Sequence, residues 1–336
     1  MGKDTSRAGS GRTDVVDWRG SSRINKAAEQ SMNRRRFLRQ VMLYSSGLSL
    51  SLPLFRIPES LAFNASVPDV ARVSGEDYTA LVKKTVELLG SMSRFVKPGY
   101  KVVVKPNIGW DRKPEQAANT HPQVVTTLVE LALEAGADEV KVFDYTCNEK
   151  RRCYNNSGMT EAIKSIGSKK AKLVHVDQRK FVPVKIAKGR SLKEWDIYKD
   201  ALTADCYINV PVAKHHGLSR LTLGLKNSMG VIGGRRGALH HDLGQNLADL
   251  ATVITPQLTI IDATRILTNN GPQGGSIEDV RRLDTLIGSV DPVAVDALAT
   301  TLFDLRPEDI SSTVAAHQMG LGQMDPAKMN IISGSV

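Results

Sequence analysis

The chain has 336 residues, of which 41% are hydrophobic and 24% charged, as is usual for folded globular proteins, so general disorder is excluded. One main domain is expected, because open α/β folds reach this length around a single sheet. The net charge of +10 does not indicate a nucleic-acid-binding protein, because residues 1–62 carry 11 basic against 5 acidic residues and aromatic residues make up only 5% of the chain.

Residues 32–65 have the layout of a secretory signal. A cationic start is followed by a modestly apolar run at 41–55 and then by small residues, with cleavage expected after Ala62 or Ala65. The alternative is a membrane anchor. The apolar run is short and interrupted by Ser and Pro, whereas a spanning helix needs about 20 apolar residues, so the signal is favoured.

Within this segment, the stretch from Asn33 to Arg39 resembles the twin-arginine export motif, with Arg34 and Arg35 as the arginine pair. This resemblance predicts a periplasmic or otherwise exported protein that meets the twin-arginine export machinery and has no stable membrane span in its mature chain. Residues 1–31 are polar and lack periodicity, so they are predicted to be a disordered lead or a mis-called extension, with Met32 as the alternative start.

Twin-arginine export carries proteins that are already folded, often with a cofactor bound, so a metal or organic cofactor is expected without being identified. The three cysteines form no CxxC pair, so the chain has no iron–sulfur cluster motif. Outside the cytoplasm Cys147 and Cys153 could pair, and the sequence leaves this open. Cys206 lies in an apolar stretch and is expected in the core.

From residue 68 to 336, short β-rich runs alternate with helical patterns, which is typical of parallel strands joined by crossover helices. Residues 101–105 and 139–143 are predicted strands around a helix at 122–134, and together they form a βαβ unit. Further elements are expected at 159–166, 172–176, 206–210, 243–254, 258–261, 285–290 and 292–303, and long loops at 145–158 and 265–283. The predicted fold is α/β, a mostly parallel open sheet with helices on both faces.

Polar or charged residues follow each predicted strand: Lys105 with Asn107, Asp144, Asp177, Lys214 with His215, Asp262 and Asp291. In open α/β sheets, ligands bind outside the carboxyl ends of the strands, so these residues point to one shared crevice. For each aspartate the alternative role is a helix cap or a turn, whereas a lysine at such a place has no capping role.

The stretch AKHHGLSRLTLGLKNSMG at 213–230 concentrates basic and amide side chains. If 219–230 is helical, Leu221, Leu225 and Met229 share one face, and Lys226 and Asn227 lie on another. A glycine-rich loop follows, in which Arg235 could hold a carboxylate or phosphate in a bidentate fork. Two interpretations remain open here, an anion pocket and a solvated cationic face.

The histidines allow two interpretations as well. An imidazole near a crevice suits general acid/base catalysis at neutral pH, and His215 is the candidate for that role. The two adjacent pairs, at 215–216 and 240–241, could instead supply metal ligands, although no spacing between them defines a geometry. For Asp291, which precedes a proline, capping of the next helix is the alternative to a site role.

The blocks VVVKPNI, THPQVVTTLVELALEAGADEVKVFD, NVPVAKHHGLSRLTLGLKNSMGVI, GPQGG and SVDPVAVDALA occur in this order over about 100–305. In these blocks the chain resembles the family known as domain of unknown function 362. The resemblance supports the α/β fold and assigns no reaction. By motif, it implies that the site residues are Lys105, Asn107, His121, Lys214, His215, Lys226, Asn227 and Asp291.

The leading hypothesis is an exported enzyme that acts on a small anionic substrate, a carboxylate or a phosphate. Lys105, Lys214 and Lys226 would neutralise the substrate oxygens, and Asn107 and Asn227 would orient it through amide hydrogen bonds. The alternative is a non-catalytic periplasmic binding protein for an anionic metabolite or a metal, because the sequence supplies no complete set of nucleophile, base and orienting group.

Overall fold

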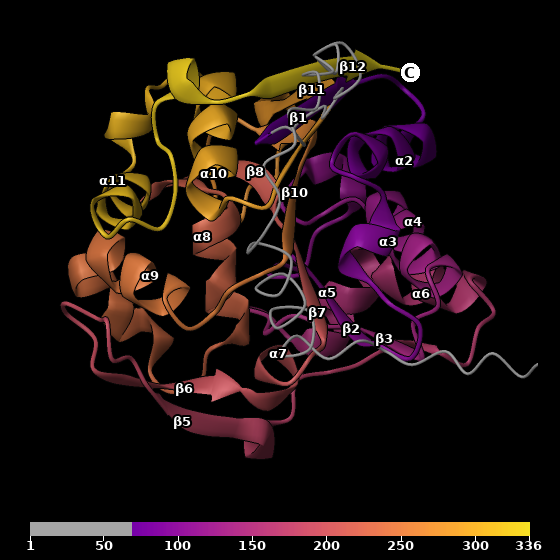
Figure 1. Ribbon diagram of the computed structural model, residues 1–336, viewed down its shortest axis with the longest axis horizontal. Helices are drawn as coiled ribbons and strands as arrows, with labels where there is room; N and C mark the ends of the chain where they lie inside the picture. The colour runs from indigo at the N-terminus through magenta and orange to yellow at the C-terminus, as the bar shows by residue number, and fades with distance from the viewer. Residues whose placement is uncertain (1–68) are drawn as a thin grey trace, which may run out of the picture. The chain divides into compact units, whose positions relative to one another are not determined.

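This computed structural model describes residues 69–336, which fold around an open β-sheet (Figure 1). In spatial order its main strands are β12 (Ile331–Ser335), β1 (Val70–Ser74), β11 (Val280–Ser289), β10 (Leu258–Leu267), β7 (Cys206–Val210), β2 (Lys101–Pro106), β3 (Glu139–Val142) and β4 (Ala171–Leu173). Three short additions are β8 (Val212–His216) beside β10, β9 (Arg220–Thr222) beside β8, and a separate pair, β5 (Phe181–Lys185) with β6 (Glu194–Tyr198). The predicted signal at 32–65 and the extension at 1–31 lie outside the described residues.

The direction of the strands confirms a mostly parallel sheet. β10, β7, β2, β3 and β4 all run parallel to one another. β11 runs antiparallel both to β10 and to β1. The carboxyl ends of β2, β3 and β7 therefore meet at one edge of the sheet, and the carboxyl end of β11 lies at the opposite edge.

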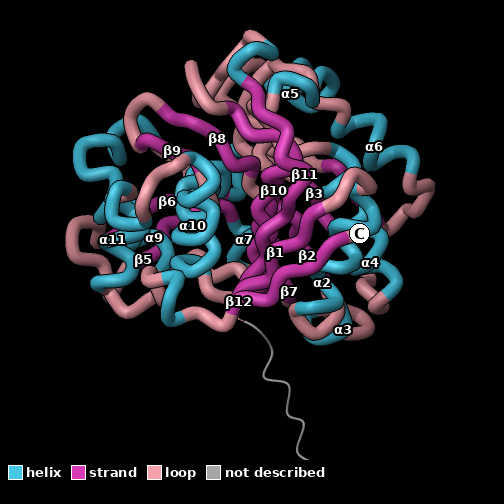
Figure 2. The backbone as a smooth tube through the Cα atoms, turned by 90° about the horizontal axis from the view of Figure 1, so that it is seen from above, coloured by secondary structure: helices cyan, strands magenta, loops and turns pink. Residues whose placement is uncertain are grey.

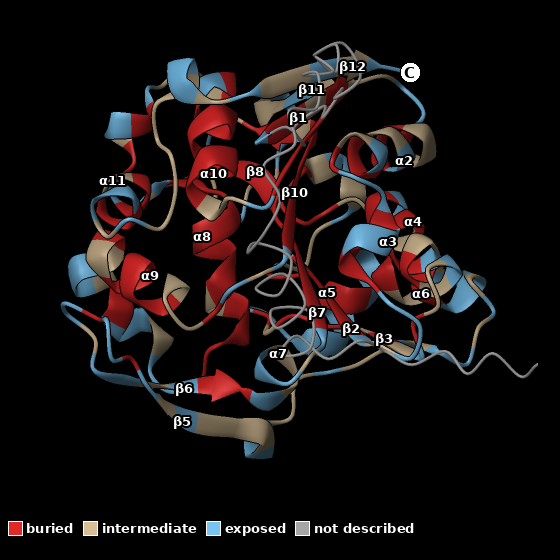
Figure 3. Cartoon of the chain, in the orientation of Figure 1, coloured by how far each residue is buried: buried red, intermediate tan, exposed pale blue. Residues whose placement is uncertain are grey.

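The central strands are apolar at successive positions because both faces of the sheet are covered. Side chains alternate between the faces of a strand, so neighbouring valines of β2 enter different cores. Val102 and Val104 pack in one apolar cluster with Leu128, whereas Val103 packs in another with Leu250. Figure 3 shows the result, with the central strands and the helix surfaces that face them buried.

Helices cover both faces of the sheet, as predicted (Figures 1 and 2). One face carries α2 (Tyr78–Leu88), α3 (Met92–Phe95), α4 (Pro122–Glu134) and α6 (Met159–Ser165). The other face carries α8 (Gly224–Asn227), α9 (Leu243–Ala251), α10 (Pro292–Thr300) and α11 (Ser311–Gln318). Two further short helices are α5 (Lys150–Asn156) and α7 (Lys199–Leu202).

The bounds of α4 coincide with the predicted helix at 122–134, because its local signals are complete. The Nδ1 atom of His121 caps the helix by accepting from the Gln123 N–H at 3.3 Å, and Pro122 occupies the first helical position. Val124, Leu128 and the other apolar residues at helical spacing face the sheet and are buried.

Three predicted segments differ from the structure. The predicted loop at 145–158 contains α5, which begins where the Glu149 carboxylate accepts from two backbone N–H groups. The predicted loop at 265–283 is shorter, because β10 and β11 extend into it. The conditional helix at 219–230 is wrong for its first half, which forms β9 in a hairpin with β8, and helical structure begins only with α8.

None of the helices from residue 69 onward has both the length and the apolar character needed to cross a membrane.

Candidate functional site

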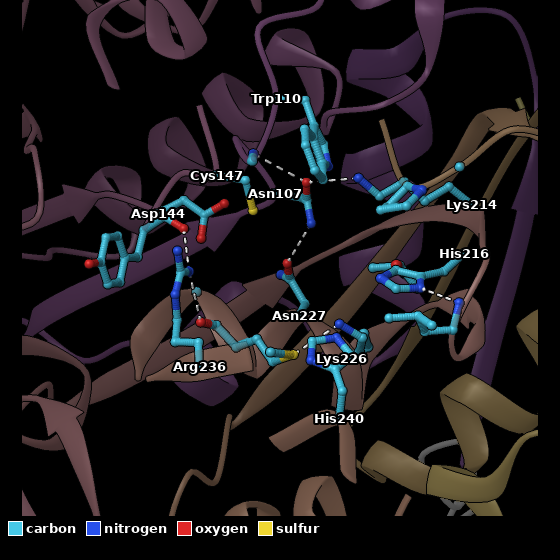
Figure 4. A pocket seen from close by; sticks show the side chains of 18 of the residues that line it. Asn107, Trp110, Asp144, Cys147, Lys214, His216, Lys226, Asn227, Arg236 and His240 are labelled. Carbon is cyan, nitrogen blue, oxygen red and sulfur yellow. Dashed lines mark hydrogen bonds between the residues drawn. The ribbon is translucent and has the colours of Figure 1, made fainter. Parts of the chain in front are cut away.

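A cavity of about 630 Å³ lies where β2 and β3 end and where the chain passes from β7 into β8. Such an edge is the usual ligand site of open α/β sheets. The polar side chains that line it come from β2 and the loop after it, the loop after β3, β8, β9, α8 and the segment beyond α8. They are Lys105, Asn107, Asp144, Cys147, Lys214, His216, Thr222, Lys226, Asn227, Arg236 and His240 (Figure 4).

Lys105 and Asp144 form a buried ion pair at the back of the cavity. The Nζ atom of Lys105 lies 2.9 Å from Oδ1 of Asp144, and it donates to the backbone oxygen and to Oδ1 of Asn227 at 2.6 and 2.8 Å. Burial lowers the pKa of Lys105, and the Asp144 carboxylate opposes that shift. The second oxygen of Asp144 accepts from the Ile108 N–H at 2.6 Å. An ammonium group has three N–H donors; Asn227 accepts from two of those of Lys105, and the Asp144 carboxylate lies beside the same nitrogen.

A chain of amides links this ion pair to the opposite wall. Nδ2 of Asn107 donates to Oδ1 of Asn227 at 3.1 Å, and Nδ2 of Asn227 donates to Oδ1 of Asn209 at 2.9 Å. Nδ2 of Asn209 in turn donates to the backbone oxygen of Gly224 at 3.1 Å. Each amide therefore donates onward, which leaves Oδ1 of Asn107 as an acceptor for Lys214 (Figure 4).

Lys214 is almost fully buried, with 1% of its surface exposed, and it has no ion pair with any carboxylate of the described chain. Its Nζ atom donates to the backbone oxygen of Ala118 at 2.5 Å and to Oδ1 of Asn107 at 3.2 Å. The pKa of Lys214 is lowered to about 7, mainly by burial; Cys147 and Asp144 oppose this shift, and the charges of Lys226 and Lys105 act in the same direction as burial. This amine therefore exchanges its proton near neutral pH.

Lys226 is the least satisfied of the three lysines. Its side chain is buried, and its Nζ atom lies 2.9 Å from the thioether sulfur of Met229, which is a weak acceptor. Among the described residues no carboxylate forms an ion pair with it. Burial lowers the pKa of Lys226 to about 8, and the nearby charges of Arg236 and Lys105 act in the same direction.

Arg236 closes the cavity from the loop after α8. Its Nη1 atom donates to the backbone oxygen of Tyr145 at 2.8 Å, its Nη2 atom donates to that of Thr146 at 3.0 Å, and the guanidinium lies 3.7 Å from the centre of the Tyr145 ring. Arg235, the predicted ligand, is exposed and does not line the cavity. Of this arginine pair, only Arg236 lines the cavity.

His216, and not the predicted His215, lines the cavity. Because this stretch is strand β8, Lys214 and His216 share one face and His215 lies on the other. Nδ1 of His216 accepts from the Leu218 N–H at 3.1 Å, and burial lowers its pKa to about 3. The ring is therefore neutral, with its proton on Nε2. His215 does not line the cavity, and its Nδ1 atom accepts from the N–H of the lining residue Gly271 at 3.1 Å.

Two other predicted site residues lie away from this cavity. His121 caps α4, packs edge-on against Tyr78 and lines a separate hollow with Arg265. Asp291 caps α10 by accepting from two backbone N–H groups at 2.8 Å, and its second oxygen accepts from the Gln323 N–H. Asp291 follows β11, and because that strand is antiparallel, its end lies at the opposite edge of the sheet. Asp177 and Asp262 do not line the cavity either.

The cysteines are free thiols, so Cys147 and Cys153 do not pair in this structure. Cys147 is exposed and lines the cavity, whereas Cys153 and Cys206 are buried. Within residues 69–336, no group of three His, Cys, Asp or Glu side chains is placed to hold a metal ion.

Asp144, Arg236 and His216 line the cavity but were not among the site residues predicted from the sequence. Asp144 stands directly after a predicted strand, which was a sufficient signal for its place. Strand periodicity at 212–216 would have selected His216. Trp110 also lines the cavity, and no local signal in the sequence points to it.

Residues 102–301 match the family model described as "Domain of unknown function (DUF362)". A thylakoid-associated protein from Synechocystis sp. is 29% identical over 257 residues, which cover 72% of this chain and 75% of that protein.

Two solved structures are similar at low sequence identity. The lactate racemase apoprotein from Thermoanaerobacterium thermosaccharolyticum is 10% identical with a TM-score of 0.38, and the match covers 64% of this chain and 53% of that one. A protein from Thermotoga maritima is 11% identical with a TM-score of 0.39, covering 68% and 58%. Both matches span little more than half of the other chain, and scores this low carry no argument about function.

Proposed function

This chain belongs to the family known as domain of unknown function 362, and because that name assigns no reaction, we propose a function from the chemistry of the cavity. In this proposal the protein is an enzyme that binds a small anion, a carboxylate or a phosphate, in this cavity and acts on it.

One observation carries the proposal: the cavity holds two buried amines, Lys214 and Lys226, that have no carboxylate partner among the described residues. A buried cation without a counter-charge costs several kcal/mol, and a bound anion would offset that cost. Within residues 69–336, the only acidic residue that lines the cavity is Asp144, which is already paired with Lys105. The volume of about 630 Å³ is in the range of small-molecule sites.

The groups that face the cavity are suited to more than binding. Lys226 has N–H donors left for an anionic oxygen, and the neutral ring of His216 can donate from Nε2. Lys214, with its pKa lowered to about 7 by burial, can give or take a proton at neutral pH. In this proposal Lys226 holds the anion and Lys214, in place of His215, performs the proton transfer.

Calorimetric titration with sulfate tests the proposal. Lys214→Met and Lys226→Met are each expected to weaken sulfate binding about tenfold or more, which corresponds to about 1.4 kcal/mol. Lys172→Met, which removes a half-exposed lysine of β4, is the matched control and should bind sulfate as the original chain does. If both cavity variants, shown to be folded by circular dichroism, bind sulfate unchanged, the proposal is wrong.

A non-catalytic binding protein for an anionic metabolite is the second candidate, and one observation favours it. Nδ1 of His215 and of His216 both accept backbone N–H groups, which leaves neither imidazole an open acceptor nitrogen for use as a base. Incubation with a pool of carboxylate and phosphate metabolites separates the two candidates. An enzyme consumes a member of the pool, whereas a binding protein is only stabilised against heat by it.

We further propose that residues 32–65 direct export to the periplasm by the twin-arginine route, on the basis of the motif alone. A fluorescent reporter fused to this segment should reach the periplasm, and replacing Arg34 and Arg35 together by lysine should retain it in the cytoplasm. Export of the double variant at the original level would refute the assignment.

A further inference from the structure

We infer that Lys214 acts as a nucleophile toward a substrate that carries a carbonyl group beside its carboxylate, a 2-oxo acid, and forms an imine with it. This inference rests on the proposed function, because it names the class of anion that the cavity accepts.

The number of acceptors around each amine separates Lys214 from the other two lysines. Lys105 meets three acceptors, one of them the Asp144 carboxylate, so it stays an ammonium ion with no lone pair. Lys214 meets two neutral oxygens, which match the two N–H bonds of an uncharged amine. The fourth tetrahedral direction at its nitrogen is then a lone pair, and Lys214 lines the cavity in which a substrate would lie.

Position also distinguishes the roles of Lys214 and Lys226. Both line the same cavity, from β8 and α8 respectively (Figure 4). Lys226 has only a thioether contact, so its ammonium can bind the carboxylate of a 2-oxo acid while the adjacent carbonyl carbon faces Lys214. Burial lowers the pKa of Lys214 to about 7, so its uncharged, nucleophilic form is available near neutral pH.

The step balances without any further reactant. The Nζ lone pair of Lys214 attacks the carbonyl carbon, a C–N bond forms, and the π electrons of the carbonyl move to its oxygen. That oxygen leaves as water with both protons of the amine, one of which Lys226 relays, and a C=N bond remains. The charged or titratable groups that act on the Lys214 amine are Asp144, Cys147, Lys105 and Lys226.

Reductive trapping with pyruvate tests the inference. The full chain is incubated with pyruvate and sodium cyanoborohydride, which reduces imines, and lactate replaces pyruvate in the control because it has the same charge and no carbonyl. Intact mass spectrometry should show one reduced pyruvate adduct, peptide mapping should place it on Lys214, and excess sulfate should suppress it. Lactate should give no adduct.

Two variants at Lys214 test the nucleophile itself. Lys214→Arg removes the nucleophile, so it should lose the adduct. Lys214→Met should lose the adduct as well, and it provides a second test if the larger arginine side chain does not fit at this buried position. If the original chain binds sulfate and forms no adduct, or if Lys214→Arg and the original chain are labelled equally, the inference is overturned and anion binding stands. If neither sulfate nor pyruvate binds, the proposed function itself fails.

Discussion

The three cavity lysines differ in how many acceptors each amine meets. Lys105 meets three, Lys214 two, and Lys226 one weak sulfur acceptor. In a buried site this number decides which N–H bonds of the amine are already used, because each acceptor replaces part of the hydration that burial removes. The same residue type therefore supplies a structural cation, a proton-exchanging amine and an anion-binding group within one cavity.

Lys214 should make the stability of the protein depend on pH. A lysine of the unfolded chain titrates near 10.5, whereas burial lowers the pKa of Lys214 in the folded protein to about 7. Between these values the unfolded chain binds more protons, so stability rises with pH through this window and is lost as pH falls toward 7. Urea unfolding at pH 7 and pH 9 should show this gain, and Lys214→Met should reduce it. Lys226 contributes a slope of the same sign, so part of the gain should remain. An unchanged slope in Lys214→Met would contradict the assignment.

The Asp144 carboxylate should be needed to compensate the buried charge of Lys105. Asp144→Asn leaves the buried Lys105 ammonium without its counter-charge, and breaking a buried pair in this way costs about 3–5 kcal/mol. Asp138→Asn is the control, because the Asp138–Lys170 pair lies at the surface and such pairs contribute about 0–1 kcal/mol. Equal unfolding free energies for the two variants would show that Asp144 is not needed to compensate Lys105.

Among the elements, α8 is short and depends on a neighbouring helix for its position. Asp296 of α10 accepts from the N–H groups of Gly224 and Leu225 at 2.6 and 2.9 Å, and thereby holds the start of α8. Lys226 and Asn227 follow within the same turn. Asp296 is buried away from the cavity lining, so this carboxylate positions the site through α8 and does not contact a ligand there.

The turn after α8 passes so close to the ion pair that it requires a glycine. A Cβ atom at Gly230 would lie 1.8 Å from Oδ1 of Asp144 and 2.4 Å from Nζ of Lys105. Gly230→Ala is therefore expected to separate that pair and to destabilise the protein by about 1–3 kcal/mol or more. Gly237→Ala is the matched control in the same cavity wall, because nothing lies within 4 Å of its Cβ position. Thermal unfolding should distinguish the two, and an equal loss of stability would contradict this account.

For the molecule as a whole, the direction of β11 separates two groups of predicted site residues. The ends of β2, β3 and β8 bring Lys105, Asp144 and Lys214 to one cavity. Because β11 is antiparallel to β10, Asp291 stands at the other edge of the sheet, where it caps α10.

Asp291→Ala should therefore affect stability and leave the cavity intact. Loss of an N-cap costs about 0.5–2 kcal/mol, and Asp77→Ala, which removes the cap of α2, gives the comparison for a cap with no proposed site role. Unfolding in urea measures this loss, and calorimetry with sulfate should give the same affinity as the original chain. A tenfold weaker affinity in Asp291→Ala alone would connect this residue with the cavity after all.

Local sequence patterns were enough to predict the α/β fold and those helices and strands whose caps and apolar positions are all encoded nearby. The helix at 122–134 carries its own cap, first-turn proline and apolar face, and the strand at 206–210 is apolar except for Asn209 and fully buried. These features depend on residues a few positions apart, so the sequence alone determines them.

The composition of the cavity was decided only by the tertiary structure. The hairpin between β8 and β9 places Lys214 and His216 on one face and turns His215 away, and the antiparallel course of β11 removes Asp291 from the site. The partners of Lys105 lie 39 and 122 positions along the chain, at Asp144 and Asn227. The direction and register of strands are set by pairing between distant segments, and so is the burial that lowers the pKa of Lys214. No local pattern encodes that pairing, which is why the sequence indicated the kinds of side chain at the site and the fold selected which of them meet.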